Sequence, residues 1–118
     1  MINSYKDLIV WQKSIELVVE VYKLTDLYPK GELYGLTSQT CRAAVSIPSN
    51  IAEGYARKHR KEYAQFIRIA FSSGAELETQ IIIAKKLGYA NEIMFARVDP
   101  LLLEVMKILN RLGSKLQN

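Results

Sequence analysis

The feature that most constrains the fold is the spacing of apolar side chains, which recur every three or four residues along nearly all of the 118-residue chain. That period matches one face of an α-helix and not the alternation of a half-buried strand. It predicts four long helices, over residues 5–27, 36–57 and 60–87 and along a stripe from Met94 to Leu112. A chain of this length forms one domain. We therefore expect residues 1–118 to form an all-α, antiparallel up-and-down four-helix bundle.

The second helix contains a proline. Its polar residues keep their helical phase across Pro48, so one continuous helix kinked at Pro48 is favoured over two helices and a loop. The proline frees the carbonyl of Ala44, and Asn50 is placed to reach the freed backbone. The polar stripe on this helix comprises Arg42, Ser46, Asn50 and Glu53.

The start and the end of the fourth helix carry conflicting signals. Asp99 followed by Pro100 is typical of an N-cap and a first helical position, which predicts a separate or kinked segment over residues 91–98. Gly113 and the tail after it are expected to fray.

Apolar surface exceeds what one bundle of this size needs. Residues 5–27 carry two apolar stripes where a small monomer needs one. The third helix has a second apolar face, nearly opposite the first. We predict that copies of the chain associate, through an interface that comprises Ala64, Phe71, Ala75 and Ile82.

Charge is mildly basic, with a net charge of +4 and an isoelectric point near 9.2. A basic run lies at the predicted turn between the second and third helices, and Tyr55 and Tyr63 flank it. Such a cluster can contact phosphates and its tyrosines can stack on bases; the alternative is a solvated turn with core tyrosines. The predicted nucleic-acid contacts are Arg57, Lys58, Arg60, Lys61 and Arg68.

No pattern in the sequence predicts catalysis, a metal site or a cofactor. The chain has one cysteine, Cys41, and one histidine, His59, and no carboxylates cluster at ligand spacing. The polar stripe could instead be an active-site row, but a hydrogen-bonded network that fixes the kink or a subunit contact is favoured. No apolar run reaches membrane-spanning length and no signal peptide is evident, so we expect a cytoplasmic protein.

Three segments resemble one known family. They read "DLIVWQKSIELVVEVYKLTDLYP" (7–29), "YGLTSQTCRAAVSIPSNIAEGYAR" (34–57) and "EYAQFIRIAFSSGAELETQI" (62–81). They resemble the four-helix bundle family of large-subunit ribosomal RNA intervening-sequence proteins over residues 5–116, most specifically at "SIPSNIAEG". That family is similar in fold to the accessory variability protein of diversity-generating retroelements, a pentameric ring with a basic surface. The resemblance implies a homopentamer.

Two functional hypotheses follow. The first is a non-enzymatic, oligomeric bundle that binds RNA or DNA, or a nucleic-acid enzyme, as an accessory protein. The alternative is a protein–protein interaction scaffold that binds no nucleic acid.

Overall fold

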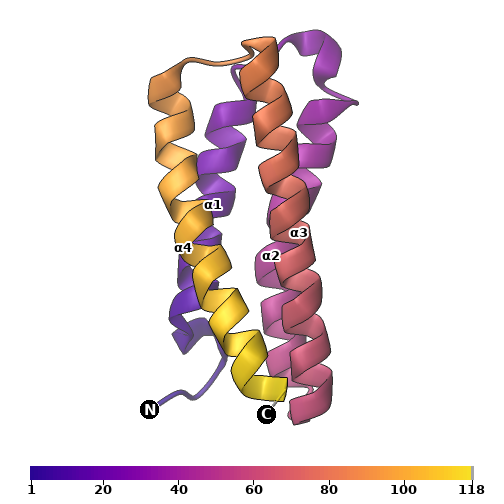
Figure 1. Ribbon diagram of the computed structural model, residues 1–118, viewed down its shortest axis with the longest axis vertical. Helices are drawn as coiled ribbons and strands as arrows, with labels where there is room; N and C mark the ends of the chain where they lie inside the picture. The colour runs from indigo at the N-terminus through magenta and orange to yellow at the C-terminus, as the bar shows by residue number, and fades with distance from the viewer. Residues whose placement is uncertain (118) are drawn as a thin grey trace.

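Four α-helices run alternately up and down in a computed structural model that describes residues 1–117 (Figure 1). They are α1 (Ile9–Thr25), α2 (Leu36–Ala56), α3 (Arg60–Leu87) and α4 (Glu92–Gln117), with short 3-10 helices η1 (Tyr5–Asp7) and η2 (Lys30–Glu32). Each helix packs against two neighbours, in the order α1, α2, α3, α4 and back to α1. The principal extents are 42 × 23 × 21 Å. The predicted all-α bundle is confirmed, and residues 1–117 contain no strand.

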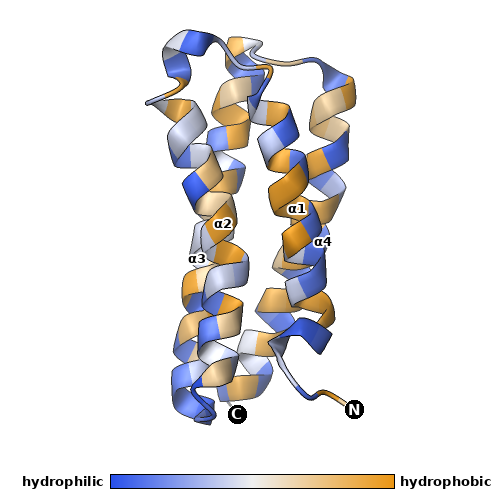
Figure 2. Ribbon diagram, turned by 180° about the vertical axis from the view of Figure 1, so that it is seen from behind, coloured by the Kyte–Doolittle hydropathy of each residue, from blue (hydrophilic) through white to orange (hydrophobic). Residues whose placement is uncertain are grey.

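The core lies between the four helices, each of which contributes buried apolar side chains, and hydrophobic positions recur along every helix (Figure 2). Of the two stripes on α1, the one through Leu17 and Val21 is fully buried, whereas Ile15 and Tyr22 of the other are 38% and 52% exposed. The remaining helices bury one face each. Their fully buried side chains include Ala44, Ile47, Ile51, Ile67, Ala70, Leu77, Ala84, Val98 and Val105.

The first helix begins later than the sequence predicts. The Ser4 hydroxyl accepts from the Lys6 N–H at 3.1 Å, and the Asp7 carboxylate accepts from the Ser4 N–H at 3.2 Å. This capping box holds the 3-10 turn η1. Leu8 is then extended, so the α-helix starts at Ile9.

The predicted separate helix over residues 91–98 is wrong, because α4 is continuous through Pro100. Asn91 is the N-terminal cap: its side-chain oxygen accepts from the Met94 N–H at 2.9 Å. Asp99 instead pairs with Lys85 at 2.6 Å. The carbonyl that Pro100 leaves without a helix donor belongs to Ala96, which is exposed, so water can bond it.

The predicted fraying of the tail is also wrong as far as Gln117, where α4 ends. Gly113 lies against α3, and a Cβ added there would sit 3.7 Å from Ile67 Cγ2. Packing on α3 therefore holds the last turns of α4 in place.

In α2 the helix runs unbroken past the buried Pro48, from Leu36 to Ala56. The Asn50 amide donates to the Ser46 carbonyl at 2.8 Å, not to the Ala44 carbonyl that the proline frees. The predicted acceptor for Asn50 is therefore wrong, because the observed carbonyl lies two residues, about half a helical turn, after that of Ala44. The Ser46 hydroxyl also bonds that of Ser73 on α3 at 2.9 Å, which ties the two helices together.

The same two helices approach closely at Gly54. A Cβ built there would lie 2.5 Å from the Cβ of Phe66 on α3. Carbon atoms in contact sit about 3.5–4.0 Å apart. Only glycine therefore fits at this position without moving one of the helices.

Candidate nucleic-acid interface

The α2–α3 turn is short and carries the basic run. Three residues join Ala56 to Arg60, and Lys58 among them has a left-handed φ of 60°. His59 is extended and its side chain makes no capping bond to α3. All four predicted cationic residues of the run are exposed.

Arg57 is bound within the chain. Its guanidinium lies 3.2 Å from a Glu53 carboxylate oxygen and 3.7 Å from one of Glu62, and sits 5.1 Å above the Phe66 ring. Two carboxylates offset its charge, so it serves to join α2 to α3. Of the predicted phosphate contacts, it is the least available.

Arg60 links the turn to the end of α4, where its guanidinium donates to the Lys115 carbonyl. Carbonyls in the last turn of a helix lack helical donors, so this bond satisfies one of them. By contrast, Lys58, Lys61 and Arg68 form no ion pair within residues 1–117.

Sequence reasoning missed a second set of cations. Lys107, Arg111 and Lys115 follow one another at intervals of four, which places them on one face of α4. They are exposed. The antiparallel packing brings the last turns of α4 to the α2–α3 turn, as the Arg60 bond shows. The four-residue spacing of these three cations is the pattern by which the sequence alone could have revealed them.

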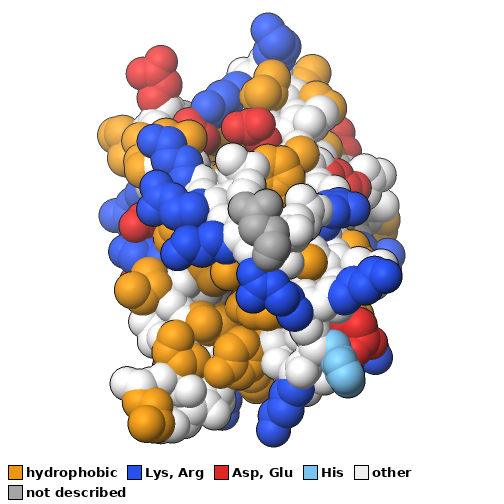
Figure 3. Space-filling model, turned by 60° about the horizontal axis from the view of Figure 1, so that its bottom comes forward, with side chains coloured by type: hydrophobic (Ala, Val, Ile, Leu, Met, Phe, Trp, Pro, Cys, Tyr) orange, Lys and Arg blue, Asp and Glu red, His pale blue; other side chains and the backbone are white. Residues whose placement is uncertain are grey.

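Charge is separated along the bundle. Cutting each helix at its midpoint gives one half that holds the α2–α3 turn (residues 1–17, 47–73 and 105–117), which we call the basic end. It has ten Lys and Arg and four Asp and Glu, a formal charge of +6. The opposite half (residues 18–46 and 74–104) we call the acidic end. It has six Lys and Arg and eight Asp and Glu, a formal charge of −2. Figure 3 looks onto the basic end, where blue side chains outnumber red.

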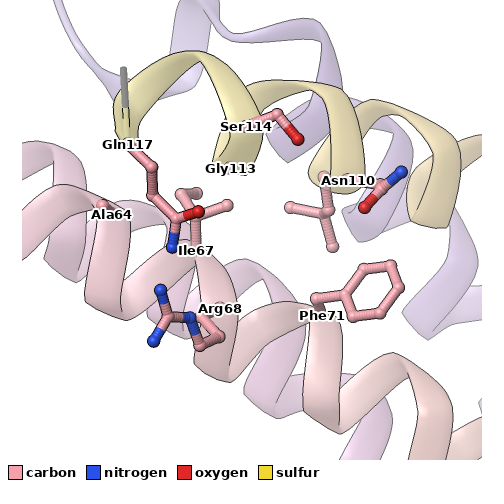
Figure 4. Close-up of a pocket in the computed structure, with 9 residues that line it drawn as sticks. Ala64, Ile67, Arg68, Phe71, Asn110, Gly113, Ser114 and Gln117 are labelled. Atoms are coloured by element: carbon pink, nitrogen blue, oxygen red, sulfur yellow. The ribbon is translucent and has the colours of Figure 1, made fainter.

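A groove of about 130 Å³ runs between α3 and α4 at the basic end (Figure 4). The buried side chains of Ile67 and Leu109 contribute apolar lining, and Phe71 faces Asn110 across the groove. Arg68 and Gln117 lie together farther along. The groove therefore offers amide groups and one unpaired guanidinium beside apolar surface.

A larger cleft, of about 440 Å³, opens beside the α2–α3 turn. Its lining residues are Asn3, Tyr55, Lys58, His59, Arg60 and Tyr63. The two tyrosine rings meet edge to face, with centroids 5.8 Å apart and planes at 87°. Burial of the Tyr63 hydroxyl raises its pKa, and neighbouring Tyr55 adds to that rise. Both rings thus pack together while still facing the cleft.

The polar stripe on α2 is divided between two roles. Ser46 and Asn50 are half-buried and hydrogen-bonded at the α3 contact, where the Asn50 amide also donates to the Ser46 hydroxyl at 2.9 Å. Glu53 is exposed and pairs with Arg57, and Arg42 is exposed. Ser46 and Asn50 thus belong to the contact between α2 and α3, Glu53 to an ion pair with Arg57, and Arg42 lines a cleft together with Ser46.

The predicted interface residues on α3 lie in different surroundings. Ala64 is buried and Phe71 half-buried, and both line the groove against α4. Ala75 and Ile82 are exposed, Ile82 by 46%. Ala64 is thus covered within the chain, whereas Phe71 is partly accessible and Ala75 and Ile82 are open to another molecule.

Other chemistry receives little support from the described part of the chain. No group of three or more His, Cys, Asp or Glu side chains within residues 1–117 is placed to hold a metal ion. Cys41 is half-buried with its sulfur 3.4 Å from the Thr25 hydroxyl. No helix within these residues is long and apolar enough to cross a membrane.

These features define a small all-α bundle that gathers its cations at one end. Residues 6–111 match the model of the family described as 23S rRNA-intervening sequence protein. The chain belongs to that family, as its resemblance predicted. No curated protein matches the chain.

Proposed function

We propose that this protein is a non-enzymatic accessory protein that binds RNA or DNA through its basic end. The observation that carries the proposal is the separation of charge, +6 at one end and −2 at the other. A field of this kind attracts polyanions to one end and leaves the other free. The family's description, which refers to ribosomal RNA, supports a nucleic acid as the partner.

The contacts divide by availability. Lys58, Lys61 and Arg68, with Arg111 and Lys107 from α4, are exposed and unpaired within residues 1–117, so they contact phosphates directly. If about four of these five residues contact a duplex at once, the binding constant falls about a hundredfold between 50 and 200 mM salt. Binding at this end is therefore strongly salt-dependent and weakly sequence-specific.

Retention of labelled structured RNA and duplex DNA at low salt tests the proposal. We expect retention by the wild type, and its loss when Lys58, Lys61 and Arg111 are all changed to Gln. A matched control changes Lys23, Lys30 and Lys86 of the acidic end to Gln, which removes the same charge and preserves retention. Equal and negligible retention of both nucleic acids by the wild type would refute the proposal.

A scaffold for another protein is the second candidate. It is favoured by a cleft of about 660 Å³ between α1 and α2 at the acidic end, lined by Tyr22, Leu33 and Tyr34 among others. The triple Gln variant of the basic end distinguishes the two candidates, because a scaffold keeps its partner when those charges are removed.

We also propose that copies of the chain assemble, and the resemblance to the family implies a homopentamer. The compartment that we propose is the cytoplasm, where one unpaired cysteine is stable. Exposed apolar side chains on several helices support association, among them Val19, Val45, Ile82 and Leu103. Light scattering should give about five times the chain mass of 13.4 kDa. A mass equal to one chain at micromolar concentration contradicts assembly.

A bend of α2 at Pro48 belongs to the same proposal, since a kinked helix changes which face of α2 a neighbouring copy meets.

A further inference from the structure

The cleft beside the α2–α3 turn combines two kinds of group that seldom meet by chance. Three of its six lining residues, Lys58, His59 and Arg60, carry cationic or protonatable side chains, and Tyr55 and Tyr63 are aromatic. Cationic groups bind phosphate, whereas aromatic rings bind the faces of unpaired bases. A duplex hides those faces inside its stack, so it cannot use the rings.

We propose that this cleft, resting on the function proposed above, holds an unpaired nucleotide of a single strand or loop. The base stacks on the tyrosine pair, and the adjoining phosphates meet Lys58 and the Arg60 guanidinium. The basic end thus prefers exposed, unpaired segments to continuous duplex.

The geometry fits one stacked base. The tyrosine rings are edge to face, at 87°, so the ring that presents its edge keeps both of its own faces clear of its partner. The volume of about 440 Å³ admits a nucleotide. Tyr63 also packs on α2, where its Cδ1 would lie 3.3 Å from a Cβ at Gly54, so it is fixed in place. Tyr55 is half-buried, lines the cleft beside Tyr63 and is the ring to vary.

The two cations of the cleft are held differently. Lys58 lies in the α2–α3 turn with a φ of 60°, and its exposed side chain can move to meet a phosphate. Arg60 is anchored on the Lys115 carbonyl, which holds its guanidinium beside the cleft before any ligand arrives. Arg60 is therefore the cation that is positioned in advance for a phosphate.

Fluorescence anisotropy with two single-stranded probes of equal length and charge tests this inference. One probe carries adenine bases and the other is abasic, and both are titrated at the same salt concentration. The wild type should bind the adenine probe about five- to a hundredfold more tightly, the range for one stacked base. Tyr55→Leu should remove this preference and leave the affinity for the abasic probe unchanged.

Two further variants complete the design. Tyr34→Leu removes a tyrosine that is 93% exposed at the acidic end and should change neither affinity. Lys58→Gln should lower the affinity for both probes by the same factor. Equal affinity of the wild type for the two probes overturns the inference while leaving the proposed function intact, as does a preference that survives Tyr55→Leu. Binding of neither probe nor of duplex overturns both.

Discussion

Replacing Gly54 by alanine should destabilise the protein, although alanine is the better helix former. The new Cβ would lie 2.5 Å from Phe66 Cβ, and 3.3 Å from Phe66 Cγ and Tyr63 Cδ1. A Cβ atom is fixed to its backbone, so α2 and α3 must separate by about 1 Å to restore contact distance. Overpacking of this kind costs up to about 3 kcal/mol.

The gain in helix propensity offsets part of that cost. Alanine is favoured over glycine by about 1 kcal/mol in a helix interior. The net loss is then about 2 kcal/mol, which lowers the melting temperature by about 8 °C in a domain of this size.

Gly113→Ala is the matched control, because the added Cβ meets only Ile67 Cγ2, at an ordinary 3.7 Å. The same propensity gain is now unopposed, so this variant should be about 1 kcal/mol more stable than the wild type. Urea unfolding at one fixed protein concentration measures both, since assembly makes stability concentration-dependent. A Gly54→Ala variant as stable as the wild type would refute the reasoning about close approach.

Three smaller predictions follow from local features. Lys58→Gly should stabilise the chain by about 1 kcal/mol in thermal unfolding, because glycine adopts a φ of 60° without strain; no gain would mean that the turn is unstrained. Thr40→Val should raise the urea midpoint by the equivalent of about 1 kcal/mol, because it removes a buried hydroxyl that has no partner within residues 1–117. The Tyr89 hydroxyl donates to Glu32 at 2.7 Å and lowers the pKa of that carboxyl. The stabilisation is therefore complete above the ordinary pKa of 4.5 and is lost as pH falls through the lowered one; Tyr89→Phe should match the wild type in acid-unfolding curves only at the acid limit.

The arrangement of the helices could be predicted from sequence because it depends on periodicity. The spacing of apolar residues located all four helices, but it did not show which of the two stripes on α1 faces the core, and the structure buries the one through Leu17 and Val21. The ends were less predictable, since several residues compete to cap a helix. Asp99 and Pro100 form a strong start signal, yet tertiary packing carries α4 past them and Asn91 is the cap. The capping box at Ser4 was readable and was missed.

The sequence predicted where the candidate site lies, but not which residues form it. A run of four cations in five residues marks the α2–α3 turn without any structure. The sequence cannot show that Arg57 is held by two carboxylates, because one of them, Glu62, lies beyond the turn. Nor does it place Lys107 and Arg111 near the turn, since that depends on how α4 packs. The cleft beside the turn also depends on tertiary packing, because Asn3 of the N-terminal segment lines it together with residues 55–63.

The salt dependence of RNA binding tests the central claim most directly. The logarithm of the binding constant for a structured RNA, plotted against the logarithm of salt concentration, should fall with a slope of about −3 to −4 for about four phosphate contacts. Changing Lys58, Lys61 and Arg111 to Gln should reduce the slope by about one for each residue. A wild-type slope near zero, or one that the three substitutions leave unchanged, would contradict binding through the basic end.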